Sequence, residues 1–294
     1  MELSPESVLL TRRNAIVTGA ARGIGRSTAL ALARFGAHVA VCDRLEDELD
    51  ETVTMLKSLG RDAPVAVLDV RDTEAVANWV ASIEEQWGAL HILVNNAGGG
   101  FVSDVVDVSA KGQAALIAEN FTQVVDTTRM CIPMLKAGAA NDPMDGTVED
   151  VRGTESVGRT CGGSSIVNIT SVEAHRAGPG FGIYSAMKAA VANITRTLAL
   201  ELSQYRIRVN AIAPDMIPTP GDSSLTLESG AMSDTTWEPT PWPEDGHPDD
   251  VASAAVWLAG PTSRFVTGTT IHVDGGTFAS SGWKRRDGDG VWIL

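Results

Sequence analysis

The sequence Ala15-Ile-Val-Thr18-Gly19-Ala-Ala-Arg-Gly23-Ile-Gly25 joins a β-branched run to closely spaced glycines, and a helix-like stretch follows from Arg26 to Phe35. The β-branched run predicts a strand, because such side chains pack well on a pleated surface. Strand, glycine-rich turn and helix in this order favour a phosphate cradle, in which backbone N–H groups at a helix N-terminus bind a pyrophosphate. Glycines by themselves indicate only a tight turn.

The next segment supports the phosphate cradle. Residues Ala37 to Cys42 predict a second strand, which ends at Asp43. An acid about 20 residues beyond such a glycine turn is placed to meet the ribose hydroxyls of a dinucleotide. The alternative is that Asp43 only caps the following helix, predicted from Leu45 to Leu59.

Strand and helix patterns alternate through the rest of the chain. Alternation of this kind predicts βαβ units with right-handed crossovers. The sequence therefore predicts that residues 1–294 form a single-domain α/β fold, a doubly wound (Rossmann) seven-stranded parallel sheet with helices on both faces. The further expected strands are 64–68, 91–94, 165–169, 206–213 and 269–273, and the further expected helices are 73–87, 111–136 and one from Tyr184 to about residue 205.

Three segments depart from this alternation. Residues 139–163 are polar and have no sustained periodicity, which predicts an inserted loop. Residues 219–249 contain several prolines and two tryptophans, and are interpreted either as a lid over a substrate or, equally, as a surface loop. Residues 277–294 form a tail that carries apolar side chains around a charged turn.

Composition narrows the class of partner. The chain of 294 residues is 44% hydrophobic, as in ordinary globular proteins, and its formal net charge is -14. Nucleic acids and anionic membranes need a basic face, so a small molecule is the expected partner. Three cysteines and five histidines are scattered along the chain, which argues against a metal site or a histidine-based triad. The N-terminal residues match neither a signal peptide nor a membrane span, and a cytoplasmic location is expected.

Tyr184-Ser-Ala-Met-Lys188 places a phenol and an ammonium four residues apart. On a helix, such side chains lie one above the other on the same face. A cation about 4 Å away is worth about 4 kcal/mol at an effective dielectric of about 20, enough to bring the pKa of a tyrosine from about 10 toward neutrality. The pair therefore indicates a tyrosine that acts as a base. The alternative is an amphipathic helix with a half-buried tyrosine and a solvated lysine.

Together these residues resemble the short-chain dehydrogenase/reductase family over about residues 14–276. The resemblance includes the tetrad Asn120, Ser171, Tyr184 and Lys188, which the family uses in catalysis. It also includes the loop Thr18–Gly25, Asp69, Asn95-Asn96-Ala97-Gly98, Pro214, Thr219 and Val273-Asp274-Gly275-Gly276. Each match is weak alone, but so many in the family's order are highly specific.

The resemblance implies an oxidoreductase that moves a hydride between a nicotinamide cofactor and a secondary alcohol or ketone, expected to be apolar. Tyr184 would be the acid/base and Ser171 would bind the same substrate oxygen. Lys188 would lower the tyrosine pKa and bind the nicotinamide ribose, while Asn120 would hold a proton-relaying water. The implied cofactor-binding residues are Gly19, Arg22, Gly23, Ile24, Gly25, Asp43, Asp69, Val70, Asn96, Ala97, Gly98, Tyr184, Lys188, Pro214, Ile217 and Thr219.

The expected cofactor is NAD rather than NADP, because the carboxylate of Asp43 would repel a 2′-phosphate. Arg22 and Arg44 complicate this expectation, since NADP-dependent relatives use nearby bases. Two alternative functions remain: an NADP-dependent carbonyl reductase of the 3-ketoacyl type, and a dinucleotide-binding protein without activity on the same fold.

Two features concern the later part of the chain. Asp215 stands where the family usually has glycine, near the expected position of the nicotinamide carboxamide. The tail beyond Gly276 is longer than the family needs, and its apolar side chains would be exposed in a monomer. In this family the chain end lies at a subunit interface, so a homo-oligomer is expected. The assembly would be a dimer or a tetramer, and the tetramer is favoured. The alternative is a tail folded over its own subunit.

Overall fold

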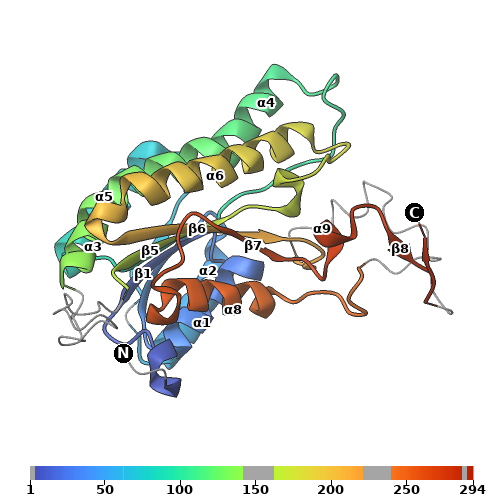
Figure 1. Cartoon of the computed structure of the whole chain (residues 1–294). Coiled ribbons are helices and arrows are strands. Elements are labelled where there is room, and N and C mark those ends of the chain that lie inside the picture. The colour runs from blue at the N-terminus through green and yellow to red at the C-terminus, as the bar shows by residue number, and fades with distance from the viewer. Residues whose placement is uncertain (1–3, 62, 142–161, 221–239, 287–289, 294) are drawn as a thin grey trace.

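A single parallel sheet forms the centre of the protein (Figure 1). The computed structural model describes residues 4–61, 63–141, 162–220, 240–286 and 290–293. Among them, seven strands pair in the order β3-β2-β1-β4-β5-β6-β7, every pair parallel. The predicted strands are confirmed, with ends shifted by at most one residue. They are β1 (Asn14–Thr18), β2 (His38–Asp43), β3 (Val65–Val67), β4 (Ile92–Asn95), β5 (Ser164–Ile169), β6 (Ile207–Pro214) and β7 (Thr270–Val273).

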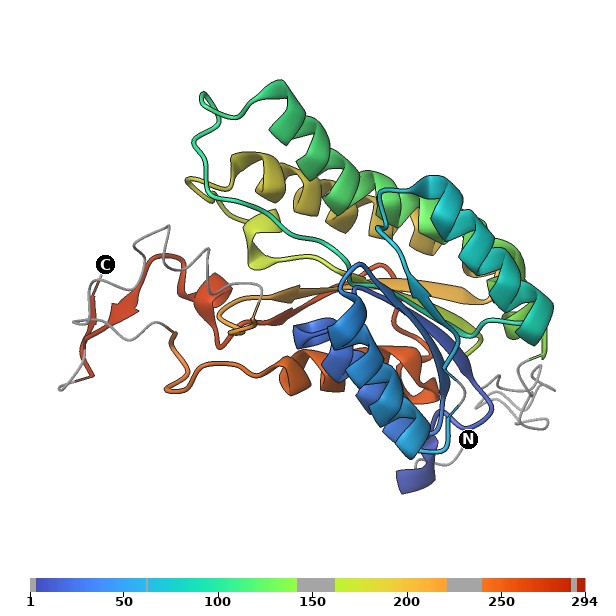
Figure 2. The ribbon, with the colours of Figure 1, turned by 180° about the vertical axis from the view of Figure 1, so that it is seen from behind.

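Helices cover both faces of the sheet (Figures 1 and 2). Each layer encloses one apolar core against the sheet, so the predicted doubly wound α/β architecture is confirmed. One layer contains α1 (Gly23–Arg34), α2 (Glu46–Ser58) and α8 (Pro248–Ala259), and the other contains α3 (Thr73–Trp87), α5 (Gln123–Asn141) and α6 (Gly182–Glu201). None of the described helices is long and apolar enough to cross a membrane.

Alternate side chains of the central strands fill the two cores. In β1, Val17 packs in the core that α1 and α8 share, whereas Ile16 packs in the core of α3 and α5. In β4, Val94 and Leu93 divide in the same way. Strand side chains point alternately to opposite faces, so a strand buried on both faces is largely apolar along its length. The chain order reverses between β1 and β4, and open α/β sheets bind ligands beyond the carboxyl ends of strands at such a point.

One predicted helix is interrupted. Where the sequence predicts a single helix over 111–136, the structure has α4 (Ala110–Ile117), a π-helical turn over Ala118–Thr122, and then α5. Asn120 lies in the wide turn and is fully buried. Its Nδ2 donates to the carbonyl oxygens of Gly99 at 2.8 Å and Leu116 at 3.0 Å. These contacts explain the extra residue of the π turn, which apolar spacing does not reveal.

The segment predicted as a loop over 139–163 is structured at both ends. Helix α5 includes Ala139, which is fully buried. The carbonyl oxygen of Gly163 accepts a hydrogen bond from Nη1 of Arg13 at 2.9 Å. Gly163 has φ +65°, and a Cβ there would lie 1.9 Å from the carbonyl oxygen of Arg206, so the position requires glycine. Most of the predicted loop (142–161) and much of the predicted lid (221–239) lie outside the described residues.

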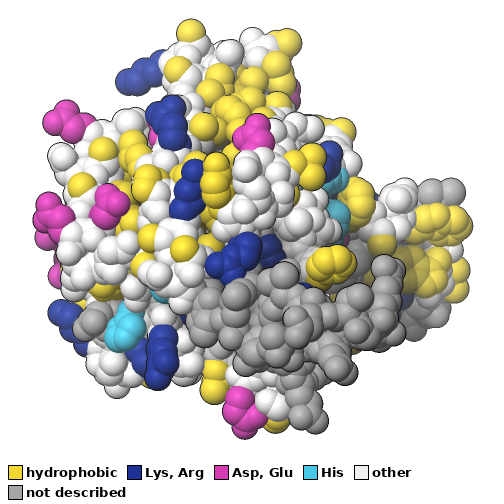
Figure 3. Space-filling model, turned by 60° about the vertical axis from the view of Figure 1, so that its left-hand side comes forward, with side chains coloured by type: hydrophobic (Ala, Val, Ile, Leu, Met, Phe, Trp, Pro, Cys, Tyr) yellow, Lys and Arg dark blue, Asp and Glu magenta, His cyan; other side chains and the backbone are white. Residues whose placement is uncertain are grey.

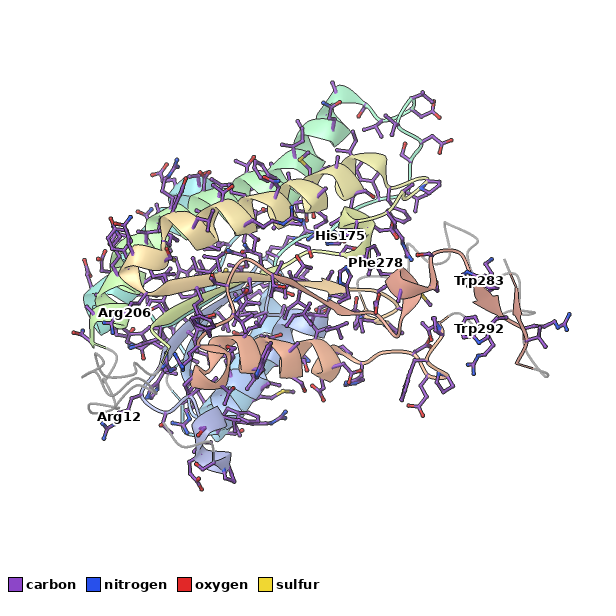
Figure 4. The ribbon with its side chains drawn as sticks, in the orientation of Figure 1. Arg12, His175, Arg206, Phe278, Trp283 and Trp292 are labelled. Atoms are coloured by element: carbon purple, nitrogen blue, oxygen red, sulfur yellow. The ribbon has the colours of Figure 1, made fainter. Side chains whose placement is uncertain are left out.

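The C-terminal segment forms an arm that extends away from the rest of the protein (Figures 1 and 2). It consists of α9 (Thr277–Ser280) and two short strands, β8 (Lys284–Arg285) and β9 (Trp292–Ile293), which pair antiparallel. Trp283 and Trp292 lie on this arm (Figure 4) and are 47% and 45% exposed. Figure 3 shows apolar side chains on the projecting lobe. The described residues of the tail therefore contain regular structure, and part of their apolar surface is exposed.

Candidate active site

The turn between β1 and α1 approaches neighbouring backbone more closely than a side chain allows. Gly19 has φ +67°, and a Cβ there would lie 2.8 Å from the Cα of Ala97. A Cβ at Gly25 would lie 1.9 Å from the carbonyl oxygen of Gly19. Both positions therefore require glycine. The turn ends at the N-terminus of α1, where the first N–H groups have no partners inside the helix and favour an anion.

Thr18 and Asn96 join the carboxyl ends of β1 and β4. Oγ1 of Thr18 accepts hydrogen bonds from the backbone N–H groups of Asn96 and Ala97, both at 3.1 Å. Nδ2 of Asn96 donates to the carbonyl oxygens of Thr18 at 3.0 Å and Gly19 at 2.9 Å. These bonds hold the glycine turn against the sequence Asn95–Gly98 at the end of β4, so two motifs distant in sequence lie side by side.

Thr219 contacts the glycine turn from the opposite side. A Cβ built at Gly23, which has φ +55°, would lie 3.2 Å from the Cβ of Thr219. Ile217 is 8% exposed and belongs to the core of α1 and α8, and Ile24 packs against the same core. The segment that follows Pro214 at the end of β6 therefore borders the glycine turn.

Asp43 lies at the carboxyl end of β2, beside the glycine turn. Its Oδ2 accepts a hydrogen bond from the backbone N–H of Ala21 at 3.0 Å. Its Oδ1 accepts one from the backbone N–H of Leu45 at 3.1 Å, and Leu45 is the N-cap residue of α2. The carboxylate thus joins the glycine turn to the start of α2.

The arginines near Asp43 face acidic side chains. Nη1 of Arg22 lies 3.4 Å from Oε1 of Glu48, and both side chains are 39% exposed. Nη1 of Arg44 lies 4.0 Å from Oδ2 of Asp69. Exposed ion pairs of this kind are weak.

Asp69 is held by Arg71 at the edge of the sheet. Nε of Arg71 donates to both carboxylate oxygens of Asp69, at 2.9 Å and 3.1 Å. These bonds are the main reason why the pKa of Asp69 is lowered from its ordinary value. Val70 is partly buried and packs against the core of α3 and α5.

Asn120 and Lys188 meet beside Gly98. A Cβ built at Gly98 would lie 3.0 Å from Oδ1 of Asn120 and 3.1 Å from Nζ of Lys188. Oδ1 of Asn120 also accepts a hydrogen bond from the backbone N–H of Gly99 at 3.3 Å. The π turn therefore brings the buried amide of Asn120 to the end of β4 and close to the lysine.

Lys188 is a buried cation next to Tyr184 on α6. It is 4% exposed, and its Nζ lies 5.5 Å from the centroid of the Tyr184 ring. Its Nζ donates to the carbonyl oxygen of Ile169 at 3.1 Å. Burial lowers the pKa of Lys188 to about 8, and the charge of Glu119 opposes this shift. The predicted tyrosine–lysine pair is therefore brought together, with the lysine buried rather than solvated.

Ser171 follows β5 and caps the short 3-10 helix η3 (Val172–Ala174). It is 9% exposed, and its Oγ accepts a hydrogen bond from the backbone N–H of Glu173 at 3.2 Å. Asn120, Ser171, Tyr184 and Lys188 thus come from the π turn, the end of β5 and α6. The fold gathers them near the carboxyl edge of the sheet, alongside the glycine turn.

The sequence analysis missed two neighbours of this site. Glu119 precedes Asn120, and a Cβ built at Gly99 would lie 3.1 Å from its Oε1. Arg176 lies in the segment after Ser171 and forms an ion pair with Asp215 at 2.8 Å. No spacing rule identifies either residue, although the unusual Asp215 marked the second contact.

Comparison with known families decides the assignment of the chain. Residues 13–142 match the family model described as short chain dehydrogenase, and residues 151–277 match that described as Enoyl-(Acyl carrier protein) reductase. An uncharacterized oxidoreductase of Mycobacterium tuberculosis is 35% identical over 266 residues, covering 89% of this chain and 90% of the relative. The chain belongs to the short-chain dehydrogenase/reductase family. It is therefore related to oxidoreductases over most of its length.

Solved structures of short-chain dehydrogenases share this fold and bind nicotinamide cofactors. Carveol dehydrogenase from Mycobacterium avium, solved in complex with NAD, is 30% identical with a TM-score of 0.78, covering 92% of this chain and 99% of its own. A protein of Agrobacterium tumefaciens assigned as a 2-deoxy-d-gluconate 3-dehydrogenase, with bound NADP, is 30% identical with a TM-score of 0.75, covering 93% and 99%. These two short-chain dehydrogenases thus differ in the cofactor bound, and the substrates after which they are named differ in polarity.

Proposed function

We propose that this short-chain dehydrogenase transfers a hydride between NAD and a secondary alcohol or ketone. The observation that carries the proposal is the buried Lys188 beside Tyr184, with Asn120 and Ser171 at the same edge of the sheet as the glycine turn. A buried cation is costly unless it is paired and hydrogen-bonded, and perturbed groups of this kind concentrate at functional sites.

In the oxidative direction, Oη of Tyr184 accepts the proton of the substrate hydroxyl. The charge of Lys188 stabilises the phenolate form: at 5.5 Å from the ring and an effective dielectric of about 20, one charge is worth about 3 kcal/mol. Ser171 uses its O–H to bind the same substrate oxygen, because its Oγ already accepts from Glu173. Asn120 positions a water that returns the proton to solvent. The nicotinamide, when bound, supplies the hydride acceptor.

The test of this proposal is turnover. Purified protein is assayed with secondary alcohols, hydroxysteroids and 3-ketoacyl esters, each with NAD(H) and with NADP(H). Reaction with apolar secondary alcohols and NAD supports the proposal, whereas reaction only with 3-ketoacyl esters and NADPH supports the alternative reductase. Dinucleotide binding without turnover on any of them would indicate a non-catalytic protein.

We expect NAD to be preferred over NADP by at least about tenfold in kcat/KM, since repulsion between Asp43 and a 2′-phosphate should exceed about 1.4 kcal/mol. Asp43→Ala should reduce this preference. The measurement is kcat/KM with each cofactor in both proteins. Asp47→Ala is the matched control, because Asp47 is an exposed acid on α2 and should leave the ratio unchanged. A wild-type preference for NADP would overturn the assignment.

We propose further that the arm supports a homo-oligomer, dimer or tetramer, in which it packs on a neighbouring subunit. The exposed Trp283 and Trp292 support this idea, since isolated soluble proteins seldom leave such patches uncovered. Truncation after Gly276 should lower the number of subunits in the assembly, measured by light scattering, and raise the KM for substrate. An unchanged number of subunits and an unchanged KM would contradict the interface. An unchanged number of subunits with a raised KM would instead indicate an arm that covers its own substrate pocket.

A further inference from the structure

The carboxylate of Asp215 joins two segments that are far apart in the sequence. Its Oδ2 accepts a hydrogen bond from Nη2 of Arg176 at 2.8 Å and another from Oγ1 of Thr277 at 2.6 Å. Its Oδ1 accepts one from the backbone N–H of Met216 at 3.0 Å. Arg176 follows η3, Thr277 begins α9, and the Asp215 side chain is 17% exposed. One carboxylate thus connects the segment after Ser171 to the C-terminal arm.

Arg176 extends this connection to Ser171. Its Nε and Nη2 donate to Oε1 of Glu173 at 3.0 Å and 2.8 Å. The backbone N–H of Glu173 in turn donates to Oγ of Ser171 at 3.2 Å. This bond occupies a lone pair of the serine oxygen and so restricts the direction in which its O–H can point. A chain of contacts therefore runs from Asp215 through Arg176 and Glu173 to the hydroxyl of Ser171.

A second contact holds the same segment against the arm. The ring of Phe278 on α9 stacks on His272 of β7, with centroids 4.4 Å apart and planes at 2°. His175 lies 4.9 Å from His272 and 5.7 Å from Phe278. His175 and Phe278 are adjacent in Figure 4. The two consecutive residues His175 and Arg176 thus both connect to the start of the arm.

We propose that Asp215 and Arg176 are positioning residues that direct the O–H of Ser171 toward the substrate oxygen, and that α9 holds Asp215 in place through Thr277. This inference rests on the proposed dehydrogenase function. The ion pair between Arg176 and Asp215 is partly exposed, with side chains 37% and 17% exposed. Its effect is geometric, because a small misplacement of a group that contacts the reacting atoms is costly to the rate.

The experiment is a double-mutant cycle on kcat. Asp215→Asn is made in the wild type and in Ser171→Ala. In the wild type we expect kcat to fall about tenfold, with unchanged dinucleotide affinity. In Ser171→Ala we expect no further fall, because the hydroxyl that Asp215 directs is absent. A fall of the same size in both backgrounds would overturn the proposal, since it would show that Asp215 acts independently of Ser171.

A second cycle needs no substrate and so separates this inference from the proposed function. Melting temperatures are measured for Asp215→Asn, Arg176→Gln and the double variant. Non-additive shifts support the contact chain, and additive shifts overturn it, whether or not the protein turns over any alcohol. Arg129→Gln is the matched control for the first cycle, in which kcat is measured. It removes an exposed ion pair with Asp126 at 2.8 Å and should leave kcat unchanged.

Discussion

Tyr184→Phe is expected to lower kcat by about 10² to 10⁴-fold, because the variant lacks the only group in the proposed mechanism that exchanges a proton with the substrate oxygen. Dinucleotide affinity should stay close to that of the wild type, since the phenol acts on the substrate and the ring is retained. The measurements are kcat for the best alcohol of the panel and the dissociation constant of NAD. A variant that keeps more than about a tenth of the wild-type rate would remove Tyr184 from the acid/base role.

Tyr205→Phe is the matched control. Tyr205 also has a lysine beside it, since Nζ of Lys136 lies 3.6 Å from the centroid of its ring. It is 40% exposed, however, and lies away from the four residues of the proposed site. Loss of its hydroxyl should leave kcat unchanged. A comparable loss in both variants would show that the effect follows from tyrosine–lysine contacts in general rather than from the site.

Lys188→Met is expected to abolish turnover and to stabilise the fold. The pKa of Lys188 is lowered from 10.5 to about 8 by burial, which corresponds to about 3 kcal/mol that folding loses while the lysine is charged. Methionine packs without a charge, but it leaves the carbonyl oxygen of Ile169 without this donor, which costs about 1 kcal/mol. The net gain at pH 7 is about 2 kcal/mol, or about 5 °C in Tm.

The gain should depend on pH in a defined direction. Below pH 8, Lys188 is charged in both the folded and unfolded states, and the full cost of burying the charge is present. Between about pH 8 and 10.5, the folded state has released a proton that the unfolded state still binds, so the stability of the wild type rises relative to the variant. The difference in Tm between the two proteins should therefore shrink as the pH rises through this range.

Lys136→Met is the control for this stability measurement. Lys136 is partly exposed, so its replacement does not remove a buried charge. It should change Tm little, and without the same pH trend. A Lys188→Met protein that is no more stable than the wild type at pH 7 would contradict the claim that burial of the Lys188 charge destabilises the fold. It would not bear on the loss of turnover, which is measured separately.

The sequence alone determined the sheet and the tyrosine–lysine pair. The strands were predictable because a strand buried on both faces, such as β1 or β4, is largely a continuous apolar run, whatever packs against it. Tyr184 and Lys188 were predictable as neighbours because four residues of helix fix their separation locally. The glycines of the first turn were predictable for a similar reason, since φ values such as the +67° of Gly19 exclude most side chains.

The tertiary structure alone decided the surroundings of that pair. Asn120 reaches the site because a π turn interrupts the helix, and the turn depends on a bond to Gly99 in another segment. Asp215 contacts Arg176, from which it is separated in the chain by α6 and β6. It also contacts Thr277, which follows it after α8 and β7. Such contacts depend on how loops end and where separate elements pack. Neither is encoded in the spacing of neighbouring residues, so only the folded chain shows them.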